Sequence, residues 1–207
     1  KSDASLQVTT NQETGEALLA GMGELHLEIT VYRLEEEQNI KVRVSNPIVV
    51  YRESVESNNH GRSFEGKSPN RHNRFMMEVE PLSAEVVAAL RDGTLGSGTI
   101  RTGDARELGR KFGELGMDKD LMRKTYAIFG TNVLVNDTKG IQGLHETREL
   151  IIESFNDVCK KGPMADEPVM GMMVRLVDAK LHEDAIHRGP AQTIPAVRKA
   201  IKGAMLR

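Results

Sequence analysis

Residues 144–163 read LHETRELIIESFNDVCKKGP, and they give the clearest structural signal in the chain. Apolar or small side chains recur at helical spacing from Leu144 to Val158, and Gly162-Pro163 ends the pattern. This spacing predicts an amphipathic helix. A β-rich run at residues 131–135 precedes it, and a second at residues 172–179 follows, so a strand is predicted on each side.

The N-terminal part predicts a smaller unit. Residues 5–9 alternate polar and apolar side chains, residues 11–15 are turn formers, and residues 17–20 are apolar, which together predict a hairpin. A broad apolar stripe predicts a helix at residues 24–37. Ile40, Val42 and Val44 predict a further strand that ends near Pro47, where a domain boundary is expected.

The segment after this boundary is expected to start with a strand at residues 48–51 and to continue as a basic loop at residues 60–74. Phe75, Met77 and Val79 then alternate with Met76, Glu78 and Glu80 and predict a strand closed by Pro81. A helix is expected from Ala84 to Arg91. Residues 92–118 contain seven glycines between charged stretches, which indicates a mobile or loosely helical insertion.

The C-terminal part is predicted as a loop at residues 181–191 and a final helix. Val197, Ala200, Ile201 and Ala204 form the apolar face of that helix. Pro195 is expected in its first turn, where the missing N–H donor costs nothing.

Composition excludes several classes of protein. Hydrophobic residues make up 39% of the 207 positions and charged residues 28%, which is too apolar for wholesale disorder. The single Cys159 excludes an intramolecular disulfide and a zinc site built from several thiolates, and it favours a reducing compartment, by default the cytoplasm. No apolar run approaches the ~20 residues that cross a bilayer.

The net charge of −2 conceals two regions of opposite sign. Residues 13–37 contain seven Glu and one Arg, whereas residues 60–74 contain four Lys or Arg and one Glu. The acidic helix is one candidate docking surface for a partner protein, and the basic loop is a candidate for nucleic acid.

Residues 61–68, GRSFEGKS, match the phosphate-loop pattern at every position. A phosphate loop must follow a buried strand and open a helix, whose N-terminal amides bind phosphate. Ser68 instead runs into Pro69-Asn70 and then a strand. A nucleotide hydrolase using Lys67 and Ser68 is therefore kept only as an alternative.

Metal and nucleophile motifs are weaker. His182-Glu183 and His187 resemble a zinc-protease signature, but those histidines are five positions apart and not four, so they would not share a helix face. Cys159 lies on the apolar side of the helix, which favours a buried side chain over a nucleophile. Glu183 and Asp184 beside Arg188 are interpreted as ion-pair partners or caps.

Two polar, basic loops remain, at residues 66–74 and 182–189. Each adjoins a strand end, and the second runs into a helix start with Arg198, Lys199 and Lys202 further along. Basic groups without interleaved aromatic residues favour contact with an RNA backbone over base stacking. A solvated basic surface without such a partner explains the composition equally well.

Three segments carry a family resemblance: GMGELHLEI at residues 21–29, GKSPNRHNR at residues 66–74 and DAIHRG at residues 184–189. The first resembles the third domain of the translocation GTPases, the family of elongation factors G and 2. The other two resemble fourth-domain loops of the archaeal and eukaryotic branch. In that branch the histidine corresponding to His187 is converted to diphthamide.

The resemblance implies an α+β fold in two parts. Residues 1–47 would be the latter part of domain III, a partial ferredoxin-like sandwich with the order strand, strand, helix, strand. Residues 48–207 would be domain IV, with a mixed sheet, two packed helices, a left-handed βαβ crossover and the insertion near residues 92–118. The GTP-binding domains, with GTP and magnesium, would lie upstream, so this chain itself would be neither an enzyme nor a holder of cofactors.

The resemblance also implies an RNA-contacting arm of a ribosomal translocation factor. Its partners would be the small-subunit decoding-site rRNA, mRNA and tRNA, together with diphthamide-synthesis enzymes and ADP-ribosylating toxins. The implied tip residues are Lys67, Asn70, Arg71, His72, Arg74, Asp184, His187, Arg188 and Gly189. Pro190 and Ala191 stand where eukaryotic members carry Gly, which indicates an archaeal source.

Overall fold

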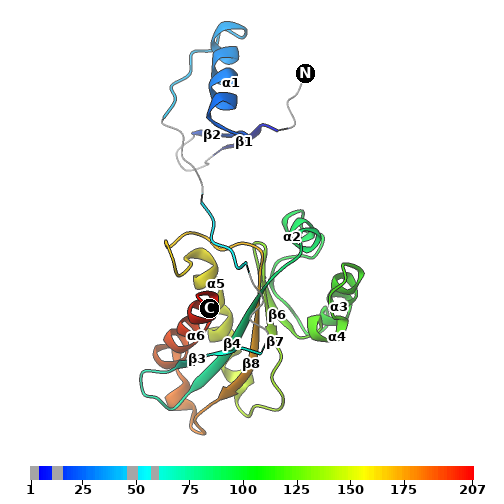
Figure 1. Cartoon of the computed structure of the whole chain (residues 1–207), viewed down its shortest axis with the longest axis vertical. Helices are drawn as coiled ribbons and strands as arrows, with labels where there is room; N and C mark the ends of the chain where they lie inside the picture. The colour runs from blue at the N-terminus through cyan, green and yellow to red at the C-terminus, as the bar shows by residue number, and fades with distance from the viewer. Residues whose placement is uncertain (1–4, 11–15, 46–50, 57–60) are drawn as a thin grey trace. The chain divides into compact units, whose positions relative to one another are not determined.

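The computed structural model describes residues 5–10, 16–45, 51–56 and 61–207. The chain divides into two compact units, residues 1–50 and residues 51–207 (Figure 1).

Unit 1 contains a hairpin and a helix. Strands β1 (Gln7–Thr10) and β2 (Ala17–Ala20) pair antiparallel, with Gln7 opposite Ala20, which confirms the predicted hairpin. The expected turn at residues 11–15 lies outside the described residues. Helix α1 (Glu24–Glu36) confirms the next prediction, but none of its residues, all of which the structure describes, is buried.

The strand predicted at Ile40, Val42 and Val44 is wrong. Residues 39–45 have no strand structure, and Val44 is 65% exposed. A strand is stabilised by hydrogen bonds to a neighbour and by burial of one face, and among the described residues of this unit the hairpin pairs only with itself. Of the strand expected at residues 48–51, positions 48–50 lie outside the described residues, and Tyr51 is not in a strand.

Unit 2 is built on a six-stranded mixed sheet with the order β3-β4-β8-β7-β6-β5. The strands are β3 (Phe64–Lys67), β4 (Arg74–Pro81), β5 (Gly98–Thr99), β6 (Thr125–Phe129), β7 (Asn132–Asn136) and β8 (Met172–Lys180). Among the six described strands of this sheet, β7 and β8 are the parallel pair, and the 3₁₀ turn η1 (Leu144–Thr147) and helix α5 (Arg148–Lys160) connect them. The predicted mixed sheet is confirmed, and the hand of this crossover stays a prediction.

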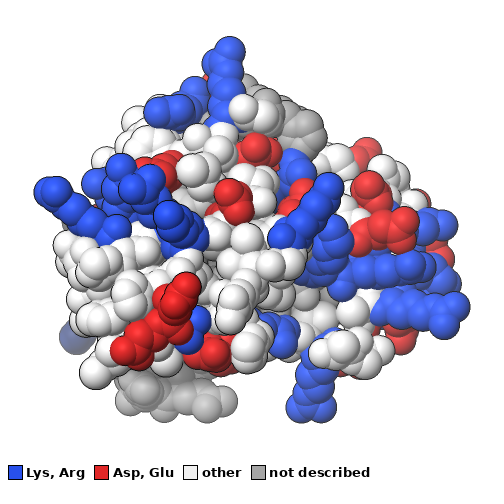
Figure 2. Space-filling model, turned by 90° about the horizontal axis from the view of Figure 1, so that it is seen from below, with Lys and Arg blue, Asp and Glu red and all other residues white. Residues whose placement is uncertain are grey.

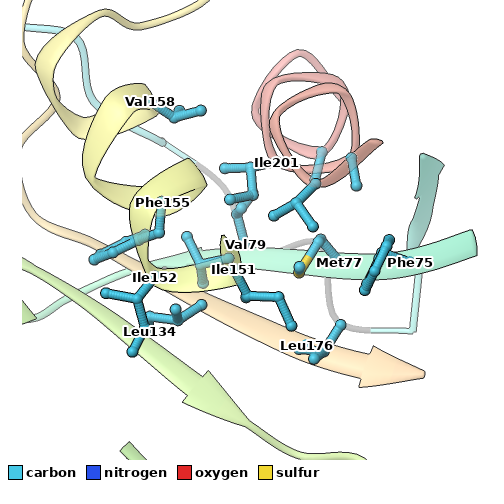
Figure 3. Packing of buried hydrophobic residues seen from close by; sticks show 14 of the residues in the cluster. Phe75, Met77, Val79, Leu134, Ile151, Ile152, Phe155, Val158, Leu176 and Ile201 are labelled. Carbon is cyan, nitrogen blue, oxygen red and sulfur yellow. The ribbon is translucent and has the colours of Figure 1, made fainter. Parts of the chain in front are cut away.

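One face of the sheet is covered by α5 and α6 (Pro190–Met205), which pack against each other. Side chains alternate across a strand, so every second residue of β4 and β8 points to these helices. Figure 3 shows the resulting core: Phe75, Met77, Val79, Leu134, Leu176, Ile151, Ile152, Phe155, Val158 and Ile201. The two packed helices expected for domain IV are therefore present.

A second core lies against the alternate side chains of β6, β7 and β8. It is formed by α2 (Ala84–Arg91), α3 (Ala105–Glu114) and α4 (Lys119–Met122). Leu108 and Phe112 of α3 are 6% and 0% exposed. The expectation of a loosely helical insertion at residues 92–118 is therefore wrong, because two apolar side chains one helical turn apart hold α3 on the sheet.

Three further boundaries differ from the sequence predictions. The expected basic loop contains β3, because residues 64–67 pair with β4. The loop expected to reach residue 191 ends earlier, since Pro190 is at the start of α6. Pro195 therefore lies inside this helix and not in its first turn, and Pro190 occupies the position where proline costs no hydrogen bond.

Candidate nucleic-acid interface

The turn between β3 and β4 has a shape fixed by buried polar groups. The Ser68 amide donates to the Asn73 carbonyl at 2.9 Å, and the Asn73 amide donates to the Ser68 hydroxyl at 3.0 Å. Asn73 is fully buried and Ser68 is 2% exposed. Arg71 adopts a left-handed backbone conformation with φ of 61°. The turn therefore presents its outer side chains from a rigid base.

The loop between β8 and α6 contains the 3₁₀ turn η2 (Ala185–Arg188). Asp184 caps it by accepting a hydrogen bond from the Ile186 amide at 3.1 Å, which confirms a capping role for this residue. The His187 amide donates to the Asp184 carbonyl at 3.2 Å. Gly189, the residue before α6, is half-buried and has ordinary extended dihedrals. Asp184 and Gly189 thus shape the loop on either side of His187.

Two asparagines bind this loop to the β3–β4 turn. Asn73 donates through Nδ2 to the His187 carbonyl at 2.8 Å and accepts at Oδ1 from the His182 amide at 3.0 Å. Asn70 donates through Nδ2 to the same His187 carbonyl at 3.2 Å, and its amide donates to Gln192 Oε1 at 2.9 Å. The structure thus brings together the two basic segments, which are more than a hundred residues apart.

Three imidazole rings lie close together at the junction where the His187 loop contacts the β3–β4 turn. The ring centroids of His182 and His187 are 4.4 Å apart, those of His72 and His182 are 5.0 Å apart, and those of His72 and His187 are 5.5 Å apart. His72 is exposed and His187 is half-buried. Among the described residues, no group of three or more His, Cys, Asp or Glu side chains has the geometry of a metal site.

The cations near the junction are arranged around β3 and α6. Lys67 and Arg74 lie 2.9 and 3.5 Å from the Glu65 carboxylate, and the hydrogen bond from Lys67 is the largest cause that lowers the pKa of Glu65. Lys67, Arg71 and Lys199 line a shallow hollow of about 470 Å³. Figure 2, seen from below, shows Lys and Arg in separate groups with Asp and Glu among them.

Arg188 does not face solvent, which corrects its predicted contact with RNA. It is 7% exposed, and its guanidinium lies 2.7 Å from Glu146 Oε2. Any side chain at Gly143 would occupy the place of this guanidinium, and Gly143 also has a positive φ of 74°. The predicted ion pair of Arg188 with Glu183 or Asp184 is also wrong, because Glu146, from the segment before α5, holds the guanidinium inward.

The phosphate-loop match has the wrong structural context. Gly66 lies in β3, where a Cβ would collide with the Ala196 carbonyl of α6. Ser68 begins a turn to β4, so no helix follows it to provide amides for a phosphate. This geometry contradicts the alternative of a nucleotide hydrolase using Lys67 and Ser68.

Cys159 is 1% exposed, and burial raises the pKa of its thiol well above the ordinary value. A thiolate at this position is disfavoured, and the predicted buried role is confirmed.

Comparison with protein families assigns both parts of the chain. Residues 97–207 match the family described as "Elongation factor G, domain IV", and residues 1–46 match "Elongation Factor G, domain III". The chain belongs to the elongation factor G family. In this chain, the β3–β4 turn lies before the residues that match domain IV. The His187 loop lies among the residues that match it.

Curated relatives of this elongation factor G family chain are named elongation factor 2. It is 54% identical over 205 residues to the protein of Picrophilus torridus, 50% identical over 208 residues to that of Methanosarcina mazei, and 47% identical over 207 residues to that of Pyrococcus furiosus. These alignments cover 99–100% of this chain but only 27–28% of each relative. The chain thus spans little more than a quarter of the relatives' length.

In the part of this family member that the structure describes, no helix is both long and apolar enough to cross a membrane.

Proposed function

We propose that this chain works in a translation elongation factor as an arm that contacts RNA at the decoding site of the small ribosomal subunit. It would act there while tRNA and mRNA move by one codon. Family membership and the names of the relatives support the role in translation. GTP and magnesium would be bound by other domains of the complete factor, which would act in the cytoplasm.

The observation that carries the proposal is the double contact of Asn70 and Asn73 with the His187 carbonyl. These contacts hold the His187 loop by its backbone, so the imidazole is not needed for the fold of the loop. A protein that uses a side chain for contact places it on a rigid support, as this arrangement does.

We propose that His187 is the residue converted to diphthamide. The loop around it is accessible to a modifying enzyme, since Ile186 is 78% exposed and Asp184 and Ala185 are exposed. The modified side chain would add a cation that touches RNA phosphates without reading sequence, as a factor that serves every codon requires. Diphthamide-synthesis enzymes and ADP-ribosylating toxins would be its protein partners.

Arg71, His72, Lys67 and Arg74 would contribute to the RNA contact from the β3–β4 turn. All four are exposed. Arg71 is the best single test, because the left-handed backbone of the turn projects it and the described residues include no acidic partner for it. Lys67 and Arg74 share Glu65, so part of their charge is already balanced.

The test is Arg71→Glu in the complete factor, with Arg106→Glu as the matched control, because Arg106 is an exposed arginine on α3. Translocation measured in single-turnover experiments should slow by at least about tenfold, as expected when one phosphate contact becomes repulsive. The control should translocate normally. An unchanged rate for Arg71→Glu would refute the tip proposal and favour docking through the acidic helix α1.

Intact mass of the protein from its native source would test diphthamide on His187.

A further inference from the structure

A second hollow of about 540 Å³ lies at the β6–β7 hairpin turn, beside the segment that leads into β8. Its lining includes Phe129 and Asn132 from the hairpin, Val169 from the segment before β8, and three cations, Arg52, Arg91 and Lys160. All belong to unit 2. Nothing in the proposed translation role uses these residues.

The walls of this hollow are held by buried hydrogen bonds. Asn132 is 1% exposed; its Nδ2 donates to the Val169 carbonyl at 2.7 Å, and its Oδ1 accepts from the Met172 amide at 3.1 Å. Thr131 Oγ1 accepts from the Gly171 amide at 3.1 Å. The hairpin turn and the segment before β8 are thus fixed to each other, so the hollow exists before any ligand binds.

The three cations reach the hollow from different parts of the fold. Arg52 lies in the segment at the start of unit 2, Arg91 ends α2, and Lys160 ends α5. In the described part of the chain, none of the three forms an ion pair with an acidic side chain. Lys160 Nζ lies 5.7 Å from the centroid of the Phe129 ring.

The carboxylates next to these arginines are engaged elsewhere. Glu53 accepts hydrogen bonds from the amides of Met164 and Ala165, both at 3.0 Å. Asp92 accepts from the Thr94 amide at 2.9 Å and from its hydroxyl, and the hydrogen bond from that hydroxyl is the largest cause that lowers the pKa of Asp92. Backbone and hydroxyl donors therefore hold both acids, so neither forms an ion pair with Arg52, Arg91 or Lys160 in the described part of the chain.

We propose that this hollow is a phosphate-binding site. Two arginines and one lysine from three parts of the fold line the hollow, and a tetrahedral phosphate can accept hydrogen bonds from several directions at once. A carboxylate has only two oxygens in one plane, so it would satisfy fewer of these donors. The phosphate would belong either to a free phosphate compound or to an RNA chain.

The site is separate from the tip at His187. The hollow lies before the first residue of β8, whereas the β8–α6 loop follows its last residue. A strand of nine residues spans roughly 30 Å. The two places lie at opposite ends of β8, and substitutions at Arg52 and Arg91 leave the tip residues unchanged, so this proposal can fail without the translation role failing.

The experiment is a titration of the 207-residue chain with pyrophosphate at constant ionic strength, followed by amide chemical shifts. The largest shifts should be those of Gly130, Thr131 and Asn132, which line the hollow. The paired variant Arg52→Gln with Arg91→Gln should weaken pyrophosphate binding by at least about tenfold, because two charge-assisted hydrogen bonds are lost. The control pair, Arg106→Gln with Arg110→Gln on α3, removes the same charge and should bind as the parent does.

A second titration with a six-nucleotide RNA identifies the source of the phosphate. Shifts at the same three amides would assign the site to RNA, and shifts with pyrophosphate alone would assign it to a free phosphate compound. The proposal is overturned if pyrophosphate shifts no amide of the hollow, or if both variant pairs lose affinity equally. It is also overturned if an Asp- and Glu-rich peptide shifts these amides more strongly than pyrophosphate does.

Discussion

Asn73 has no exposed surface, and its side chain bonds to two residues of the loop between β8 and α6. Its neighbours in the chain, His72 and Arg74, are exposed. One buried amide between two exposed side chains therefore joins two loops that are distant in the sequence.

The substitution Asn73→Ala should lower the free energy of unfolding by about 1–3 kcal/mol, because the part-buried His187 carbonyl and His182 amide each lose a hydrogen-bond partner. Chemical denaturation of the purified chain measures this change. His72→Ala, which removes an exposed side chain, should stay within about 0.5 kcal/mol of the parent. Equal stabilities for Asn73→Ala and His72→Ala would show that Asn73 does not join the loops.

The substitution His187→Ala should change the free energy of unfolding by less than about 0.5 kcal/mol, because Asn70 and Asn73 hold the backbone of this residue and not its ring. The same denaturation experiment measures it. A loss comparable to that of Asn73→Ala would mean that the three imidazoles stabilise the fold through their packing.

At the scale of elements, β3 and α6 approach so closely that only glycine fits between them. A Cβ on Gly66 would collide with the Ala196 carbonyl and lie 2.8 Å from the Ala200 amide nitrogen. β3 is the edge strand of the sheet, and its contact with α6 fixes where the β3–β4 turn begins.

The substitution Gly66→Ala should therefore destabilise unit 2 by about 1–3 kcal/mol, since an added methyl group forces the helix and the strand apart. Gly103→Ala is the control, because a Cβ there meets open space, and it should change stability by less than about 0.5 kcal/mol. Thermal unfolding of both variants provides the comparison. If Gly66→Ala and Gly103→Ala unfold at the same temperature, β3 and α6 do not pack as closely as the structure indicates.

Asp137, the residue after β7, is a charged group whose contribution to stability depends on pH. Burial tends to raise the pKa of Asp137, but hydrogen bonds and charge from Arg175 and Lys124 outweigh burial and lower it. Its folded pKa is thus below the unfolded value, so its stabilising effect is present above the ordinary value of 3.8 and is lost as pH falls through the lowered pKa.

Asp137→Asn should accordingly be less stable than the parent at neutral pH, and the difference should disappear in strong acid. Urea denaturation across this pH range measures it. A difference that persists unchanged in acid would assign the loss to packing and not to the ion pairs with Arg175 and Lys124.

At the scale of the whole molecule, the two units differ in how much they bury. Unit 2 has a core on each face of its sheet, whereas α1 of unit 1 leaves Leu25 and Tyr32 exposed at 69% and 64%. A helix of this length without packing is marginally stable in water.

Amide hydrogen exchange should therefore be at least about a hundredfold faster in α1 than in β8, the strand buried at the centre of unit 2. Mass spectrometry of exchanged peptides measures both elements in the same sample. Equal protection of α1 and β8 would show that α1 has a stabilising contact that its exposed apolar side chains do not reveal.

Local pattern in the sequence was sufficient for the elements whose period is clear. The helix at residues 148–160, the strands containing Phe75 and Val174, and the hairpin of unit 1 follow from the spacing of apolar residues, because burial on one face imposes that spacing. The resemblance of residues 66–74 and 184–189 also predicted the family, and the match of residues 97–207 to "Elongation factor G, domain IV" confirms that prediction.

Only the tertiary structure decided the remainder. Glycines suggested that residues 92–118 were loose, but Phe112 is fully buried in the second core. Alternation suggested a strand at Ile40, but no described neighbour pairs with it. The sequence suggested that Arg188 is a surface cation, but it pairs with Glu146, 42 positions away. Asn73 joins two loops because its side chain bonds to His187, 114 positions away. Hydrogen bonds and ion pairs between distant segments form only where the fold brings those segments together. The spacing of residues within one segment does not contain this information.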